Sequence, residues 1–125
     1  MVSDFDQLAG MQPLRIWDGI AARTVHGERV SFAVIELDPG STVPEHRHEN
    51  EQLGVLASGT MRFRIGEETR ELGPGATWYI PANVPHEVEA GPEGAVAVEV
   101  FAPRRDDWSG LERLPGSRPR WPQTG

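Results

Sequence analysis

The stretch 40-GSTVPEHRHENEQLGVLASG-59 holds three side chains that suit a metal ion. His46 and His48 are two residues apart, and on a β-strand this spacing points both imidazole rings to the same face. Gln52 follows at a turn, where its amide oxygen can join the two rings. We therefore predict that this segment contributes three ligands to one metal site.

A second stretch, 75-GATWYIPANVPH-86, supplies a third histidine at its end. Three neutral imidazoles and one amide oxygen suit a borderline divalent metal such as Zn, Ni, Mn, Co or Fe, and they do not suit Ca or Mg. Because Gln52 is neutral, the metal would keep its full charge and act as a stronger Lewis acid. We expect one divalent transition metal per chain, bound by His46, His48, Gln52 and His86.

Together the two stretches resemble the paired motifs of the cupin family. The first motif, with Gln where most cupins carry Glu, is matched by Gly40, His46, His48, Gln52 and Gly59. The second motif is matched by Gly75, Pro81 and His86. Asn83 replaces the usual Gly, and Asn is the next residue most able to adopt a positive φ, so we expect the turn to be preserved. The resemblance implies a conical β-barrel with the metal in its mouth.

Short β-rich stretches flank these motifs, and no segment of ten or more residues shows helical periodicity. Met61, Phe63 and Ile65 alternate with arginines, which is typical of a half-buried strand. We expect hairpins with turns at residues 58–59 and 91–94, and helix only as about one turn near residues 107–111. This pattern predicts an all-β fold, and the resemblance implies a cupin-type double-stranded β-helix, a jelly-roll barrel of two antiparallel sheets.

The length of 125 residues allows one domain. We expect an N-terminal arm over residues 1–14, a single cupin β-barrel domain over residues 15–112, and a Pro/Arg-rich C-terminal tail over residues 113–125. Apolar residues outside the motif core, namely Phe5, Leu8, Leu14 and Trp17, are candidates for the interface of a homodimer, the expected oligomeric state.

Composition excludes several kinds of chemistry. The chain has no cysteine, so it has no disulfide, no thiolate nucleophile and no Cys-ligated zinc. All 12 basic residues are arginines, which excludes mechanisms that need a lysine amine. A net charge of -7 argues against nucleic acid and anionic membranes as partners. No apolar run is as long as a membrane span, and residues 1–10 lack the basic and apolar blocks of a signal peptide. We therefore expect a cytoplasmic protein.

Within the cupins, the chain most resembles the KdgF-type proteins of uronate catabolism. The resemblance rests on the metal-ligand set, on residues 78–81 (WYIP) and on residues 99–108 (EVFAPRRDDW). KdgF proteins act on 4,5-unsaturated monouronates, the end products of pectin and alginate lyases, and promote their conversion to the linear keto form. The resemblance implies that the family's pocket carboxylate, phenylalanine and arginine correspond to Glu99, Phe101 and Arg105. The family's carboxylate is Asp, and Glu is one methylene longer.

Glu99 also stands out on physical grounds, because residues 95–101 (AVAVEVF) are otherwise apolar. We expect this strand to be buried on both faces, with Ala97, Glu99 and Phe101 pointing into the barrel. Glu99 would then lie near the metal as a catalytic acid/base. The alternative is that Glu99 lies on an exposed edge or pairs with an arginine across the sheet.

These parts predict a metal-dependent enzyme that opens the ring of 4,5-unsaturated uronates without a redox change. Glu99 would move a proton, Arg105 would hold the carboxylate of an anionic sugar acid by a two-point contact, and Phe101 would pack on the sugar ring. Two alternatives stay open: a cupin dioxygenase that uses Fe or Mn, and a non-catalytic cupin that binds a small ligand.

Overall fold

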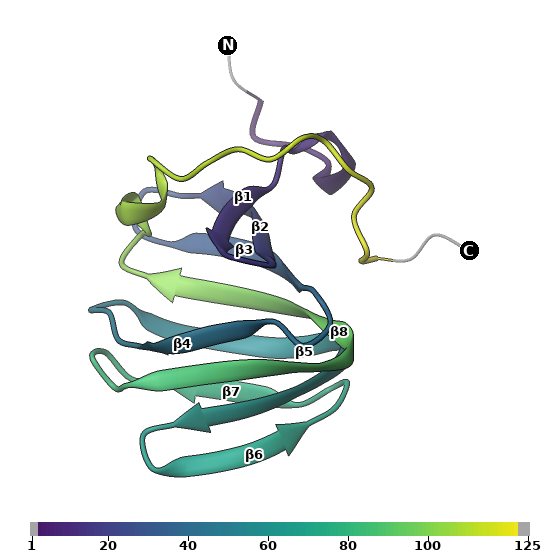
Figure 1. The fold of residues 1–125 in the computed structure, drawn as a ribbon. Coiled ribbons are helices and arrows are strands. Elements are labelled where there is room, and N and C mark those ends of the chain that lie inside the picture. The colour runs from purple at the N-terminus through teal and green to yellow at the C-terminus, as the bar shows by residue number, and fades with distance from the viewer. Residues whose placement is uncertain (1–2, 123–125) are drawn as a thin grey trace.

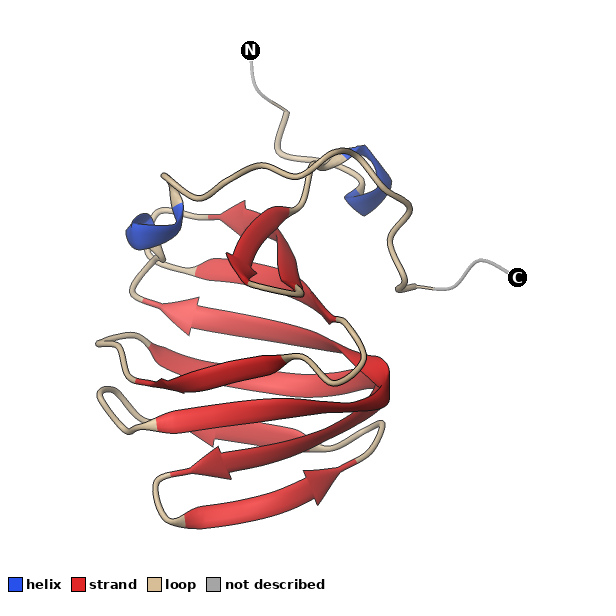
Figure 2. Cartoon of the chain, viewed as in Figure 1, coloured by secondary structure: helices blue, strands red, loops and turns tan. Residues whose placement is uncertain are grey.

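Strands dominate residues 3–122, the part of the chain that the computed structural model describes (Figure 2). Two single-turn 3-10 helices, η1 (Leu8–Gly10) and η2 (Asp106–Trp108), lie near the two ends of the chain. The strands, in chain order, are β1 (Leu14–Trp17), β2 (Ile20–His26), β3 (Ser31–Leu37), β4 (Thr42–His46), β5 (Glu51–Ile65), β6 (Glu68–Leu72), β7 (Thr77–Ile80) and β8 (His86–Ala102). The all-β class is confirmed.

The strands form two antiparallel layers that share β5 and β8 (Figure 1). The larger layer has the order β1, β2, β3, second half of β8, first half of β5, β7. The smaller layer has the order β4, first half of β8, second half of β5, β6. Because the two long strands run through both layers, hydrogen bonding is continuous over all eight strands. This is the predicted jelly-roll barrel.

The two predicted hairpins are wrong, because the chain does not reverse at residues 58–59 or 91–94. Instead, β5 and β8 run on for 15 and 17 residues, and both bend where Gly59 pairs with Ala95. Gly59 and Gly94 each have φ of 78°, and a Cβ on Gly59 would lie 2.0 Å from the Gly94 carbonyl oxygen. The turn-forming glycines therefore mark the corner at which paired strands pass from one layer to the other.

The core lies between the two layers. On β5, Met61 and Phe63 are buried, whereas Arg62 between them is exposed, as the alternation predicts. On β8, Ala97, Glu99 and Phe101 are buried on the inner face. The outer face of this strand is only partly covered, since Val100 is 36% exposed, so the expected burial on both faces is wrong at that position.

The C-terminal segment runs along the outside of the larger layer. Its backbone pairs with the N-terminal strand, because Leu114 N donates to the Pro13 carbonyl. Farther along, the guanidinium of Arg23 donates to the backbone carbonyl and hydroxyl of Ser117. η2 lies where the sequence predicts a helical turn, and no helix in residues 3–122 is long and apolar enough to cross a membrane.

Candidate metal centre and cavity

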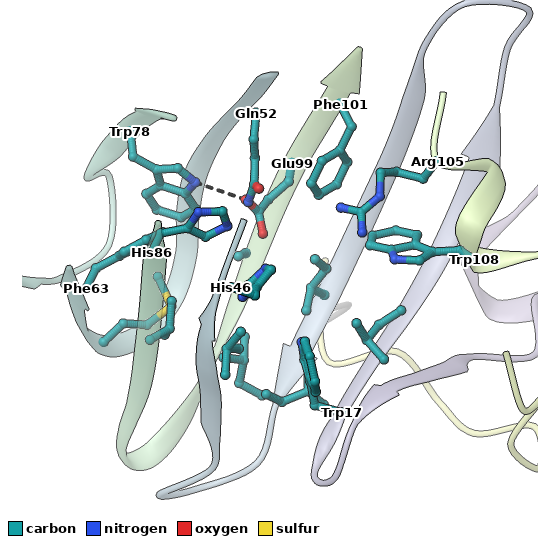
Figure 3. Close-up of a pocket in the computed structure, with 18 of the residues that line it drawn as sticks. Trp17, His46, Gln52, Phe63, Trp78, His86, Glu99, Phe101, Arg105 and Trp108 are labelled. Atoms are coloured by element: carbon teal, nitrogen blue, oxygen red, sulfur yellow. Dashed lines mark hydrogen bonds between the residues drawn. The ribbon is translucent and has the colours of Figure 1, made fainter. Parts of the chain in front are cut away.

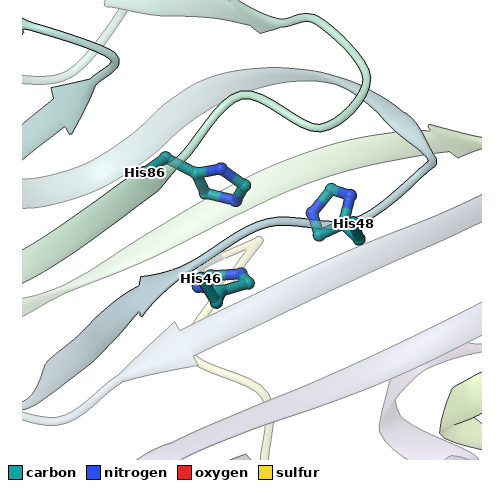
Figure 4. Close-up of side chains that lie close together, drawn as sticks. All are labelled: His46, His48 and His86. Atoms are coloured by element: carbon teal, nitrogen blue, oxygen red, sulfur yellow. The ribbon is translucent and has the colours of Figure 1, made fainter.

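Three histidines meet at one end of the barrel (Figure 4). His46 is the last residue of β4 and pairs with His86, the first residue of β8. His48 lies in the loop after β4 rather than on the strand, so the expectation of two rings on one strand face is wrong. One ring nitrogen of each histidine lies within 4.8 Å of the others. The loop is tied to the second motif, since Asn83 N donates to the His48 carbonyl.

The turn at Asn83 has the expected conformation, with φ of 63°. Asn therefore fills a position of the second motif that needs the left-handed region, as its tolerance of positive φ predicts. This turn places His86 opposite the loop that carries His48.

Each histidine ring is held by a backbone carbonyl two residues away. The Nδ1 atoms lie 2.9 Å from the carbonyl oxygens of Pro44, Asn50 and Val84, for His46, His48 and His86 respectively. A neutral ring that donates from Nδ1 keeps a lone pair on Nε2, the nitrogen that a metal binds.

Burial keeps two of these rings neutral. It lowers the pKa of His86 to about 4 and lowers the pKa of His48, and the positive charge of Arg105 acts in the same direction. His86 Nε2 is buried without a hydrogen-bond partner among the described residues. Such an orphaned acceptor is costly unless a cation binds it.

Gln52, on β5, completes the predicted set of four. Its Nε2 donates to Glu99, which turns Oε1 toward His48, 3.1 Å from Nε2 of that ring. If His48 is neutral and donates from Nδ1, Oε1 and Nε2 are two acceptors in contact. A shared cation relieves that repulsion, so the residues present fit a divalent metal held by three imidazoles and one amide oxygen.

Glu99 points into the barrel beside this set, and it is only 7% exposed. One oxygen, Oε2, accepts hydrogen bonds from the Gln52 amide and, at 3.0 Å, from the indole nitrogen of Trp78 (Figure 3). Oε1 accepts none from the described residues. Burial raises the pKa of Glu99, although the two hydrogen bonds oppose that rise. Glu99 thus lies neither on an exposed edge nor in an ion pair within the described chain.

Trp78 is a site residue that the sequence analysis did not assign. Its indole packs against Phe63, with ring centroids 5.2 Å apart, and lies over Gly54 on the neighbouring strand. A Cβ on Gly54 would lie 2.3 Å from the indole, so only glycine leaves room for the ring. The sequence feature that could have indicated the role of Trp78 is Gly54, a glycine in the middle of an apolar strand.

Arg105 lies at the other side of the cavity, between two aromatic rings. The guanidinium carbon is 4.9 Å from the centre of the Phe101 ring and 4.3 Å from that of Trp108. Its Nε and Nη2 each donate to a carboxylate oxygen of Asp107 at 3.0 Å. Asp107 thus occupies two of the three guanidinium nitrogens, and Nη1 is the one it leaves for a ligand.

Three of the predicted ligands line one cavity of about 240 Å³ together with the acid and the arginine of the site: His46, Gln52, His86, Glu99 and Arg105 (Figure 3). Most of its wall is apolar, and the polar groups gather toward the histidines and Arg105. Trp17 also lines the cavity, where its ring lies 5.5 Å from that of His46. A cavity of this kind, with a few convergent polar groups, is typical of a small-molecule site.

Comparisons with known proteins agree with this geometry. Residues 33–101, more than half of the chain, match the Cupin domain family. The pectin degradation protein KdgF of Dickeya dadantii is 26% identical over 93 residues, which cover 73% of this chain and 84% of that protein. An uncharacterized protein of Streptomyces coelicolor is 27% identical over 86 residues, or 69% of this chain and 82% of that protein.

Solved structures show the same architecture. The structure of KdgF from a Halomonas species aligns with a TM-score of 0.77 at 24% identity, and the match covers 85% of this chain and 98% of that chain. At this identity the likeness concerns the fold, while the side chains described above define the site.

Proposed function

The chain belongs to the cupin family, and we propose that it is a metal-dependent enzyme that opens the ring of 4,5-unsaturated uronates and converts them to the linear keto form. The observation that carries the proposal is the Oε1 of a buried Glu99, which accepts no hydrogen bond from residues 3–122 and lies beside a small cavity and the predicted metal ligands. The substrate class comes from the likeness to KdgF proteins. The match to the KdgF protein of Dickeya dadantii covers 84% of that protein.

His46, His48, Gln52 and His86 would hold the divalent metal. When bound, the metal supplies Lewis acidity toward oxygen atoms of the substrate, without a redox change. The carbonyl contacts at Nδ1 fix the rings, and Gln52 is fixed by its bond to Glu99. The ligand geometry is therefore set by the chain itself.

Arg105 and Phe101 bind the substrate in this proposal. Nη1 of Arg105 donates to the substrate carboxylate, while Asp107 fixes the orientation of the guanidinium. The ring of Phe101 is almost fully buried and packs against the sugar ring, which excludes water. The expected two-point contact is replaced by a single contact from Nη1.

Glu99 moves the proton. Ring opening removes a proton from the hemiacetal hydroxyl, breaks the bond between that carbon and the ring oxygen, and delivers a proton to the former ring oxygen, so that an aldehyde and an enol result. The enol becomes a ketone when carbon 4 gains a proton and the hydroxyl loses one. Oε1 of Glu99 is the free oxygen that can carry it, and burial raises the pKa of this carboxyl toward the range of a general acid.

The test follows the loss of ultraviolet absorbance of freshly generated 4,5-unsaturated galacturonate and mannuronate. We expect the purified protein to exceed the spontaneous rate, to lose this activity with a chelator and to regain it with added divalent metal. A spontaneous rate that the metal-loaded protein leaves unchanged would refute the proposal. Oxygen uptake with iron bound would instead identify a dioxygenase, and ligand binding without turnover would identify a binding protein.

A further inference from the structure

The cavity continues past the polar groups of the site into the interior of the barrel. Ile65 pairs with the predicted ligand His86, and Met61 lies four residues away from Ile65 on the same strand. At a strand rise of about 3.3 Å per residue, this places Met61 about 13 Å deeper than the histidine. His86 and Met61 nevertheless line the same cavity. The cavity is therefore longer than the polar site at its mouth.

The deep part of the cavity, which we call the inner chamber, is apolar. Its wall consists of buried side chains that carry no charge, hydroxyl or amide: Ile20, Ile35, Leu37, Met61 and Ala97. On β8, Glu99 is the last polar residue before this chamber, and Ala97 follows it on the same face. Apolar cavities of this kind stay dry and take up apolar molecules. The chamber thus suits an apolar group of a ligand.

The proposed ring opening addresses only one end of its substrate. The keto product has a carboxylate, a ketone next to it and then a methylene carbon, which together form a 2-oxo acid group. Arg105 serves the carboxylate in that proposal, and Glu99 serves the methylene carbon. The remaining carbons of a uronate carry hydroxyls and an aldehyde, for which the inner chamber has no hydrogen-bond partner.

We propose that the same site interconverts the keto and enol forms of 2-oxo acids that carry an apolar side chain, and that this side chain occupies the inner chamber. The carboxylate binds Nη1 of Arg105 at the mouth. Because Glu99 lies between Arg105 and Ala97 along the chain and the cavity wall, carbon 3 of the acid meets Oε1 while the side chain continues past it. This activity goes beyond ring opening, but it rests on the roles proposed above for Glu99 and Arg105.

The reaction is a proton transfer without a change of oxidation state. Oε1 of Glu99 takes a proton from carbon 3, and the electron pair of the broken C–H bond forms the double bond between carbons 2 and 3. The carbonyl oxygen gains a proton from water at the mouth, which completes the enol. In the reverse direction Glu99 returns a proton to carbon 3. In D₂O, the protons on carbon 3 are therefore replaced by deuterium.

Two ligands that share the 2-oxo acid group test the inner chamber directly. Pyruvate has no further side chain, whereas 4-methyl-2-oxopentanoate carries a branched apolar one. In NMR of the zinc-supplied protein with ¹³C-methyl methionine, we expect 4-methyl-2-oxopentanoate to shift the Met61 signal. Met11, which is partly exposed and lies outside this cavity, is the internal control. The longer acid should also bind at least about 10-fold more tightly than pyruvate, because it buries more apolar surface. An unchanged Met61 signal, or equal affinity for the two acids, overturns the proposal.

A larger side chain in the chamber should exclude the apolar group. Ala97→Leu is expected to weaken binding of 4-methyl-2-oxopentanoate by at least about 10-fold, whereas Ala9→Leu, at an exposed position of η1, should leave it unchanged. Equal binding by both variants overturns the proposal. Circular dichroism checks the fold of each variant, and if Ala97→Leu does not fold, the comparison of the two acids in the parent protein decides.

Deuterium exchange at carbon 3 of 4-methyl-2-oxopentanoate, followed by proton NMR, tests the reaction. The parent protein should exceed the spontaneous rate, and Glu99→Gln should bind the acid without accelerating exchange. A rate equal to the spontaneous one overturns the proposed reaction. Exchange without ring opening of uronates supports this inference and contradicts the proposed function. Ring opening without a response of Met61 overturns this inference alone.

Discussion

The two carboxylate oxygens of Glu99 have different surroundings: Oε2 accepts the hydrogen bonds that hold the side chain in place, and Oε1 stays available for proton transfer in the proposed reaction. Both Gln52 and Trp78 donate to Oε2, and this fixes the carboxylate without occupying Oε1. The same bond orients the Gln52 amide so that its oxygen turns toward His48. A single buried carboxylate thus couples the ligand geometry to the proposed acid/base.

Replacing this carboxylate by its amide tests the division of roles. In Glu99→Gln, the amide oxygen can still accept from Gln52 and Trp78, so we expect metal content to equal that of the parent protein. Turnover of the unsaturated uronates should fall by at least about 100-fold, because the amide cannot move a proton. Glu89→Gln, an exposed position on the same strand, is the control. Parent-like turnover of Glu99→Gln would show that another group carries the proton.

The buried histidine makes the metal-free protein sensitive to pH. The pKa of His86 is about 4 in the folded chain and about 6.5 when unfolded, because burial disfavours the charged ring. Between these values the unfolded chain binds a proton that the folded chain does not. The free energy of unfolding should therefore decrease as pH falls from about 6.5 to about 4.

Urea denaturation of the chelated protein across this pH range measures the effect. His86→Asn should flatten the decrease, whereas His26→Asn, at an exposed histidine outside the site, should retain it. Equal slopes for the parent protein and His86→Asn would contradict the neutral, buried state of His86.

The sequence predicted those site residues that lie close together in the chain, and it missed residues whose roles depend on contacts in the fold. The ligands share two short motifs, so their spacing alone indicated a metal site. Trp78 and Asp107 were missed because their roles come from contacts that spacing does not show. Trp78 reaches Glu99 from another strand, and Asp107 pairs with Arg105 through the local turn of η2.

At the scale of the elements, β7 and the first half of β5 fit together because a glycine on β5 leaves room for a large side chain on β7. Gly54 lies directly opposite Trp78, and the indole occupies the space that a side chain would take. This pairing holds the indole nitrogen against Glu99. Strand register and the proposed acid/base are therefore linked through one glycine.

Adding a methyl group at Gly54 tests this link. Gly54→Ala should displace the indole and lower the free energy of unfolding by about 1–3 kcal/mol, the usual cost of overpacking a core. Turnover should decrease as Glu99 loses a donor. Gly73→Ala, where a Cβ meets nothing within 4 Å, should change neither quantity. Chemical denaturation and near-ultraviolet circular dichroism measure both variants, and an unperturbed Trp78 signal in Gly54→Ala would refute the argument.

The elements also show where local sequence signals mislead. Glycines at the ends of apolar runs predicted two hairpins, but the same glycines serve as corners of β5 and β8. A corner and a hairpin need the same backbone freedom, and only the pairing of distant strands distinguishes them. The alternation at residues 61–63, by contrast, was sufficient to predict that Met61 and Phe63 face inward.

At the scale of the whole molecule, the barrel presents a different surface on each side. One end carries the metal ligands and the cavity, the outer face of the smaller layer carries ion pairs such as Arg62 with Glu71, and the outer face of the larger layer exposes apolar side chains such as Leu53. The short β-rich stretches were enough to predict the all-β class, and the resemblance carried by the two motifs predicted the jelly-roll barrel and the cluster of histidines at one end. The course of residues 112–120 along the larger layer depends on long-range contacts of Arg23 and Glu36, which no local pattern encodes.

The central claim is that the chain holds one divalent transition metal at His46, His48, Gln52 and His86. Elemental analysis of protein purified without a histidine tag, after dialysis against a metal-free buffer, tests it most directly. We expect about one metal ion per chain, and a loss of at least about 10-fold in affinity in His86→Ala, whereas His26→Ala should retain the ion. A parent protein that takes up no stoichiometric metal, or a His86→Ala variant that binds it as tightly, would contradict the account.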